Sequence, residues 1–177
     1  MKKNGPWKIK SSKPVYKNSW ISVREDQVIR PDGKDGIFGV VELKSGVSVI
    51  AMNDDNYVYL GKEYQYVMSD YNIKATDGGI DDGETPLEAA KRELKEELGI
   101  IAEDWLSLGY VNPFTEVIKS RSYLFLARKI SFIKANKEGT ETIERIKIKF
   151  DKAVDMVLKS EITHGPSSVL ILKAKEY

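Results

Sequence analysis

Apolar and polar residues alternate in short segments along the first seventy residues, which is the pattern of strands with one buried face. Residues rich in Gly, Pro, Asn and Asp separate these segments at positions 31–33, 44–46 and 53–56. The pattern predicts strands at residues 20–28, 37–43, 47–52 and 57–66. The N-terminal half of the chain is therefore expected to form a sheet.

A three- to four-residue period replaces this alternation in the middle of the chain. The apolar positions form one stripe of a helix, and they are Leu87, Ala90, Leu94 and Leu98. Thr85 and Glu88 have the spacing of a capping box at the start. Pro86 suits the first helical position, and Gly99 supplies the stop. The sequence predicts a helix over residues 86–98.

The remainder of the chain contains segments of both kinds, some with the alternation of strands and some with the helical period. Further apolar or alternating segments predict strands at residues 106–111, 123–127 and 146–150, with a polar loop at residues 135–142. Helices are predicted near residues 151–159 and from Pro166 onward, with the single His164 at the start of the last one. This order predicts an α+β domain in which helices cover a mixed sheet.

Composition narrows the functional classes. The chain has 177 residues, which suits one well-buried domain and is too short for two large ones. Its 28 Lys and Arg residues balance 27 Asp and Glu residues, so we expect neither a nucleic-acid partner nor a membrane partner. No apolar run has the length of a membrane span, and no signal-like segment follows Met1, which favours a soluble cytoplasmic protein. The absence of cysteine removes disulfides, thiolate nucleophiles and cysteine-ligated zinc.

The predicted central helix carries an unusual group of acids at Glu93, Glu96 and Glu97. Glu93 and Glu97 are four residues apart and so lie one above the other beside the apolar stripe. Two like charges about 4 Å apart repel by about 4 kcal/mol at an effective dielectric constant of ~20. The acids could fan out into solvent opposite neighbouring basic residues, one could take up a proton, or a divalent cation could bind between them.

Residues 78–100 as a whole resemble the signature of the Nudix hydrolases. Every fixed position of that signature is filled here, by Gly78, Glu84, Arg92, Glu93, Leu94, Glu96, Glu97, Gly99 and Ile100. A match of this length at fixed spacing is specific, unlike a lone short glycine motif. The resemblance implies the Nudix fold, an α/β/α sandwich with a mixed sheet, over residues 46–177.

Residues 1–45 precede the part that resembles the minimal Nudix domain. Such an N-terminal β extension is typical of family members that hydrolyse ADP-ribose and other nucleoside diphosphate sugars. In those relatives its strands often help to build a homodimer and to shape the base pocket. By analogy we expect a homodimer that acts on a small nucleotide substrate.

The resemblance also implies a metal site. It identifies Glu93 and Glu97 as direct ligands of Mg²⁺ or Mn²⁺, with Glu96 sharing a second ion and the backbone carbonyl of Asp77 as a further ligand. Oxygen ligands of this kind suit both cations. The implied reaction is attack of water on a phosphorus of a diphosphate linkage, with Glu93, Glu96 and Glu97 as the catalytic residues.

Supporting roles can be assigned around this site. We expect Arg92 to pair with Glu84 in a fork and so tie the loop to the helix. Gly78, Gly79 and Gly83 would let the loop turn tightly and let phosphate approach the backbone. The more distant candidates are Lys62 and Arg121 as phosphate contacts, and Glu141, ahead of Glu144 and Glu116, as a general base.

The expected substrate is ADP-ribose or another nucleoside diphosphate sugar. Two alternatives stay open: hydrolysis of a nucleoside triphosphate or dinucleoside polyphosphate, and a non-catalytic module that senses a nucleotide. Two departures from the ADP-ribose branch bear on this choice. The Gln and Arg of a common Gln-Tyr-Arg strand segment are replaced within residues 60–66, and Lys74 stands where relatives often carry an acid.

Overall fold

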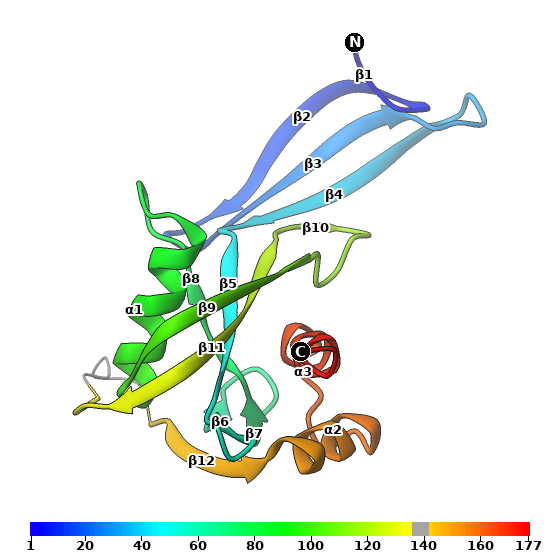
Figure 1. Ribbon diagram of the computed structural model, residues 1–177. Coiled ribbons are helices and arrows are strands. Elements are labelled where there is room, and N and C mark those ends of the chain that lie inside the picture. The colour runs from blue at the N-terminus through cyan, green and yellow to red at the C-terminus, as the bar shows by residue number, and fades with distance from the viewer. Residues whose placement is uncertain (136–141) are drawn as a thin grey trace. The chain divides into compact units, whose positions relative to one another are not determined.

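Two separately packed units make up the chain in the computed structural model, which describes residues 1–135 and 142–177. Unit 1 comprises Met1–Lys44 and Asn112–Arg121, and unit 2 comprises Ser45–Val111 and Ser122–Tyr177 (Figure 1). The assignment of residues 112–121 to unit 1 was not expected from the sequence, because a short segment between two strands carries no signal of its distant partner.

Unit 1 is a five-stranded sheet with no helix among its residues, all of which are described. In spatial order its strands are β1 (Lys2–Asn4), β2 (Trp7–Lys17), β3 (Ile21–Ile29), β4 (Asp35–Leu43) and β10 (Ile118–Lys119). β3 and β4 confirm the strands predicted at residues 20–28 and 37–43. β2 was not predicted, because its Lys- and Ser-rich sequence is almost wholly exposed and lacks apolar alternation. The segment is a strand because its backbone pairs with β3.

Unit 2 contains a seven-stranded mixed sheet within the described residues. Its strands are β5 (Gly46–Met52), β6 (Tyr57–Gln65), β7 (Asp70–Lys74), β8 (Thr76–Gly79), β9 (Ile100–Val111), β11 (Ser122–Phe132) and β12 (Glu144–Lys149). The central order is β12-β6-β5-β11-β9, with β7 beside β6 and β8 beside β5. β11 runs parallel to β5, and the other pairs are antiparallel.

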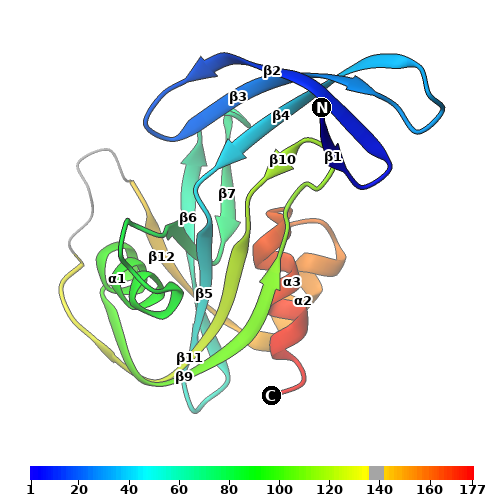
Figure 2. The same ribbon diagram turned by 90° about the horizontal axis from the view of Figure 1, so that it is seen from above.

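Helices cover both faces of this sheet (Figure 2). The helices are α1 (Pro86–Leu98), α2 (Phe150–Leu158) and α3 (Gly165–Ala174). Alternate residues of β5 enter two separate cores: Val49 packs in the cluster that includes Leu94 of α1, and Ile50 packs in the cluster that includes Leu170 of α3. This two-sided burial explains the unbroken apolar run of β5. The predicted α/β/α sandwich with an N-terminal β extension is confirmed.

In unit 2, β7 and β8 were not predicted as strands, and β9 and β11 are longer than predicted. β9 begins at Ile100, directly after α1, although only residues 106–111 were predicted as a strand. β8 has the sequence Thr-Asp-Gly-Gly, which by itself indicates a turn, yet it pairs with β5 from Gly46 to Val49. Both strands are fixed by their neighbours, which local sequence does not encode. No helix in the described part of the chain is long and apolar enough to cross a bilayer.

Candidate active site

The ends of α1 are fixed by the residues that the sequence assigned to them. The Thr85 hydroxyl accepts a hydrogen bond from the Glu88 N–H at 3.3 Å, and the Glu88 carboxylate accepts one from the Thr85 N–H at 2.8 Å. At the other end Gly99 has φ 61°, a left-handed conformation that glycine adopts without strain. The capping box and the stop are thus confirmed, and they set which residues of α1 face the sheet.

Arg92 of α1 binds Glu84 in the loop before the helix through two parallel hydrogen bonds. Its Nε donates to Glu84 Oε1 and its Nη2 donates to Glu84 Oε2, both at 2.9 Å. Glu84 Oε2 also accepts a bond from the Asp81 N–H at 3.1 Å, within the same loop. Hydrogen bonds from Arg92 lower the pKa of the Glu84 carboxyl, so Glu84 stays ionised.

The same guanidinium reaches the acids of the helix and the backbone of the loop. Its Nη1 donates to Glu93 Oε1 at 2.7 Å and to Glu96 Oε2 at 3.3 Å, and its Nη2 donates to the Gly79 carbonyl at 2.9 Å. The bond to Glu84 and the charges of Glu84 and Glu93 raise the pKa of Arg92 despite partial burial. Arg92 therefore ties the end of β8 and the loop before α1 to two of the three clustered acids.

Gly78 lies directly against the carboxylate of Glu93. A Cβ placed on Gly78 would be 2.0 Å from Glu93 Cδ and from Oε1, far inside van der Waals contact. Gly78 lies in β8 and pairs with Val47 of β5. Glycine is required here because the backbone of β8 and the acid of the helix approach so closely. The predicted role of Gly78 and Gly79 in a tight turn was wrong, because pairing with β5 holds both residues in a strand.

The acids of α1 are buried to different extents. Glu97 is 4% exposed and Glu93 is 9% exposed, whereas the side chain of Glu96 is 33% exposed. Carboxylates as buried as Glu93 and Glu97 require compensating charge. Hard oxygen donors beside the Gly78 backbone suit Mg²⁺ or Mn²⁺ in chemical type. Within residues 1–135 and 142–177, however, no three acidic or histidine side chains converge closely enough to enclose an ion, so ligation by these acids stays a prediction.

Lys74 lies among further carboxylates of unit 2. Its ammonium is 2.6 Å from Asp77 Oδ1 and 3.1 Å from Glu63 Oε2, and its side chain is 12% exposed. Burial by itself lowers the pKa of Lys74, but attraction to Asp77, Glu63 and Glu97 outweighs it and the net pKa is raised. The sequence marked Lys74 as a departure from relatives but did not predict its partners. The β6–β7 hairpin is the signal that could have found Glu63. Lys74 pairs with Gly61, and Glu63 lies two residues further along β6, as a diagonal neighbour of Lys74.

α3 contacts the same segment through buried hydrogen bonds. Ser167 Oγ accepts a bond from the Ala75 N–H at 2.9 Å and is hydrogen-bonded to His164 Nδ1 at 2.7 Å. Burial lowers the pKa of His164, which favours the neutral imidazole. His164 is the N-cap of α3, as its predicted position at the start of that helix implied. Beside it, a cavity of about 310 Å³ is lined by Gln65, Met68, Asn72, Lys74, Thr163, His164 and Gly165.

The remaining candidates come from other parts of the chain. Lys62 lies on β6 with its ammonium 5.6 Å from the centre of the Tyr71 ring. Arg121 belongs to unit 1. Glu144 is exposed at the start of β12, and Glu141 lies outside the described residues. The roles suggested for these four residues stay predictions.

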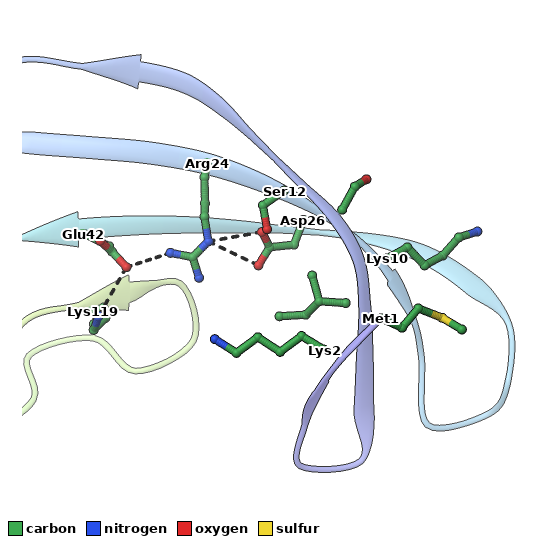
Figure 3. A pocket seen from close by; sticks show the side chains of 10 residues that line it. Met1, Lys2, Lys10, Ser12, Arg24, Asp26, Glu42 and Lys119 are labelled. Atoms are coloured by element: carbon green, nitrogen blue, oxygen red, sulfur yellow. Dashed lines mark hydrogen bonds and ion pairs between the residues drawn. The ribbon is translucent and has the colours of Figure 1, made fainter.

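Unit 1 has a charged cavity of its own, of about 460 Å³ (Figure 3). Arg24 crosses it and pairs with Asp26 at 3.2 Å and with Glu42 at 2.7 Å, and Lys119 pairs with Glu42 at 3.4 Å. No residue of the segment 78–100 lines this cavity. The charges of Arg24 and Glu42 in this cavity are paired with other charged residues of unit 1.

Comparison with known proteins identifies the larger part of the chain. A family model described as "NUDIX domain" matches residues 42–164. The chain belongs to the Nudix family. A second model, "Nucleoside diphosphate sugar hydrolase N-terminal domain", matches residues 7–41. The expected membership of the ADP-ribose and nucleoside diphosphate sugar branch, and with it a Nudix pyrophosphohydrolase, is confirmed.

Individual relatives cover nearly the whole chain at low identity. An ADP-ribose pyrophosphatase of Bacillus subtilis is 24% identical over 169 residues, which are 92% of this chain and 90% of the relative. A methanol dehydrogenase activator of Bacillus methanolicus is 25% identical over 163 residues, covering 89% and 86% of the two chains. A crystal structure of an ADP compounds hydrolase matches with a TM-score of 0.85 at 19% identity, covering 99% of this chain and 96% of that chain. At this identity, the match to the crystal structure shows a shared fold and nothing more specific.

Proposed function

We propose that this Nudix enzyme hydrolyses the diphosphate linkage of a nucleoside diphosphate sugar, with ADP-ribose as the leading candidate. The observation that carries the proposal is the pairing of two family matches: residues 7–41 match the N-terminal domain of nucleoside diphosphate sugar hydrolases, directly before the Nudix domain at residues 42–164. The similarity of the chain to an ADP-ribose pyrophosphatase along 92% of its length supports the choice of ADP-ribose. With ADP-ribose the products would be AMP and a sugar phosphate.

Glu93, Glu97 and Glu96, with the backbone carbonyl of Asp77, are the residues that would hold Mg²⁺ or Mn²⁺. The burial of Glu93 and Glu97 and their purely oxygen donor set support this assignment. A bound divalent ion supplies charge neutralisation at phosphate oxygens and lowers the pKa of a bound water.

The chain's own residues set the geometry of this site. The forked bond from Arg92 to Glu84 fixes the loop, and the bond from the same guanidinium to the Gly79 carbonyl fixes the backbone that phosphate would approach. Arg92 also holds Glu93 and Glu96 at the loop side of α1. Preorganised charge of this kind is the main contribution a protein makes to phosphoryl transfer.

A substrate panel with product identification tests the proposal. We expect Mg²⁺-supplemented protein to cleave ADP-ribose or another nucleoside diphosphate sugar faster than nucleoside triphosphates and dinucleoside polyphosphates. Faster cleavage of either of the latter two would favour the first alternative. Binding of a nucleotide without any cleavage would favour a sensing module.

We also propose a homodimer built with the β extension. Several apolar side chains of unit 1 are exposed to solvent within the chain, and they are Val15, Tyr16, Trp20 and Ile37. Exposed apolar groups on a single-layer sheet favour association with a second surface.

A further inference from the structure

The cavity of about 310 Å³ in unit 2 is lined by the β6–β7 hairpin and by the start of α3. Small-molecule cavities span roughly 300–1,000 Å³, so this one has room for a single small group. Lys74, one of its lining residues, pairs with Asp77 of β8 at 2.6 Å. The residue after Asp77 is Gly78, which lies against the Glu93 carboxylate. The cavity therefore borders the candidate active site.

His164 gives this cavity a hydrogen-bond donor. Its Nδ1 is 2.7 Å from Ser167 Oγ, which already accepts a bond from the Ala75 N–H. Ser167 is fully buried, and a buried hydroxyl donates its proton, so it donates to His164 Nδ1, its remaining partner among the described residues. A neutral imidazole that accepts at Nδ1 carries its own proton on Nε2. The Nε2–H of His164 is then the group that can donate to a ligand.

Gln65 supplies the complementary acceptor. Its Nε2 donates to Glu63 Oε2 at 3.0 Å. Because a carboxylate only accepts, this bond fixes the amide with its nitrogen toward Glu63 and leaves Oε1 as an acceptor for a ligand. A hydroxyl group both donates and accepts, so it suits the donor of His164 together with the acceptor of Gln65.

The lining residues favour a neutral, hydroxyl-bearing group over a phosphate or a base. The one cation among the described lining residues is Lys74, whose ammonium is paired with Glu63 at 3.1 Å and with Asp77 at 2.6 Å. A phosphate would have to compete with these two carboxylates. The described lining residues include no Phe, Tyr or Trp, the rings on which bases usually stack.

We propose that this cavity binds the terminal sugar of the substrate, with His164 Nε2–H donating to a sugar hydroxyl and Gln65 Oε1 accepting from one. The inference rests on the proposed function in taking a nucleoside diphosphate sugar as the ligand. Both contacts are made only by a ligand that carries the sugar, so they distinguish ADP-ribose from ADP.

Nuclear magnetic resonance of the single histidine tests which group enters the cavity. Isotope-labelled full-length protein in EDTA would be titrated with ADP-ribose and, separately, with ADP, which lacks the terminal ribose. We expect the free protein to show the Nε2-protonated imidazole, and ADP-ribose but not ADP to shift its signals. An Nδ1-protonated ring, an equal shift with ADP, or no shift at the highest soluble concentration of ADP-ribose would overturn the proposal.

Gln65→Leu removes the acceptor and nearly keeps the size of the side chain. Gln27→Leu is the matched control, because Gln27 Nε2 also donates to a glutamate two positions earlier, Glu25, at 3.1 Å, but at an exposed position of β3. By calorimetry we expect Gln65→Leu to bind ADP-ribose about three- to tenfold more weakly than the wild type, with the affinity for ADP unchanged. Gln27→Leu should match the wild type with both ligands. An unchanged affinity for ADP-ribose, or an equal loss for both ligands, would contradict the contact.

Neither titration requires turnover, so the two proposals fail separately. Hydrolysis is measured on the wild type with Mg²⁺. Binding that depends on the sugar without any cleavage would refute the proposed function and leave the cavity assignment intact. Cleavage of ADP-ribose without a sugar-dependent response of His164 would do the reverse.

Discussion

Arg92 and Glu84 meet through two hydrogen bonds of 2.9 Å, although the residues stand on opposite sides of the start of α1. A guanidinium and a carboxylate in this fork are matched in both spacing and direction. Because the same guanidinium also donates to Glu93 and Gly79, this one pair sets the distance between the glycine loop and the acids of the helix.

Replacing Arg92 by lysine tests that coupling. An ammonium keeps the charge but cannot make two parallel bonds to Glu84 while it reaches Glu93 and the Gly79 carbonyl. We expect kcat to fall by about 10- to 100-fold, the usual effect of losing a residue that orients metal ligands. Steady-state kinetics and circular dichroism would check this, with Lys91→Arg as the control. A rate near that of the wild type would show that the fork does not position the site.

Gly78→Ala tests the close approach of β8 to Glu93. Because a Cβ would lie 2.0 Å from the Glu93 carboxyl carbon, either the acid or the strand must move. We expect a loss of about 1–3 kcal/mol in the free energy of unfolding and at least about a tenfold loss in kcat/KM. Urea denaturation and kinetics measure the two effects.

Gly39→Ala is the matched control for that variant. Gly39 is also a strand glycine, and a Cβ there meets no described atom within 4 Å. Its stability and rate should stay close to those of the wild type. Indistinguishable behaviour of the two alanine variants would contradict the crowding at Gly78.

Glu97→Gln tests the most buried acid of α1. If Glu97 ligates a metal ion, removing its charge should cost more than the 10- to 100-fold typical of residues that only orient ligands, so we expect kcat to fall by at least about 100-fold. The fold should persist, because the amide keeps the size of the side chain. The exposed Glu103→Gln variant serves as control. Retention of near-full rate would remove Glu97 from the metal site.

His164 should make stability depend on pH. Burial lowers its pKa in the folded state below the ordinary value of about 6.5, so the unfolded chain takes up the proton first as pH falls. The free energy of unfolding should therefore decrease as pH falls from about 6.5 through the folded pKa, by at most about 1.4 kcal/mol per pH unit. Urea midpoints at several pH values would measure the slope.

His164→Asn provides the comparison, since the chain has one histidine and asparagine can also cap α3. The variant should lose the part of the slope below about pH 6.5 that His164 contributes. An identical slope in both proteins would show that His164 does not titrate differently on folding.

The expected homodimer can be measured by sedimentation equilibrium. The mass should be twice the 20.0-kDa mass of the chain. Trp20, which is 75% exposed within the chain, is a suitable position to disturb association. We expect Trp20→Lys to weaken the dimer and Lys13→Ala, at an exposed position of β2, to leave it unchanged. A wild type that stays at the mass of one chain would refute the dimer.

Local chemistry accounts for what the sequence predicted well. α1 lies at residues 86–98 as expected, because its cap, its first-turn proline and its terminal glycine are all chosen by neighbours within a few positions. The fork between Glu84 and Arg92 was predicted from a motif whose fixed spacing already implies that the two meet. In contrast, β2 and β8 carry weak local signals and exist because β3 and β5 pair with them.

The sequence by itself determined the Nudix segment, the α+β class and the acids that α1 presents. Only the tertiary structure decided that Gly78 touches the Glu93 carboxylate, that residues 112–121 join unit 1, and that Lys74 lies between Glu63 and Asp77. The physical reason is the sequence separation between the residues that determine each feature. A helix and its caps depend on neighbours within four residues, whereas strand register and buried ion pairs depend on segments that meet only once the sheet has assembled.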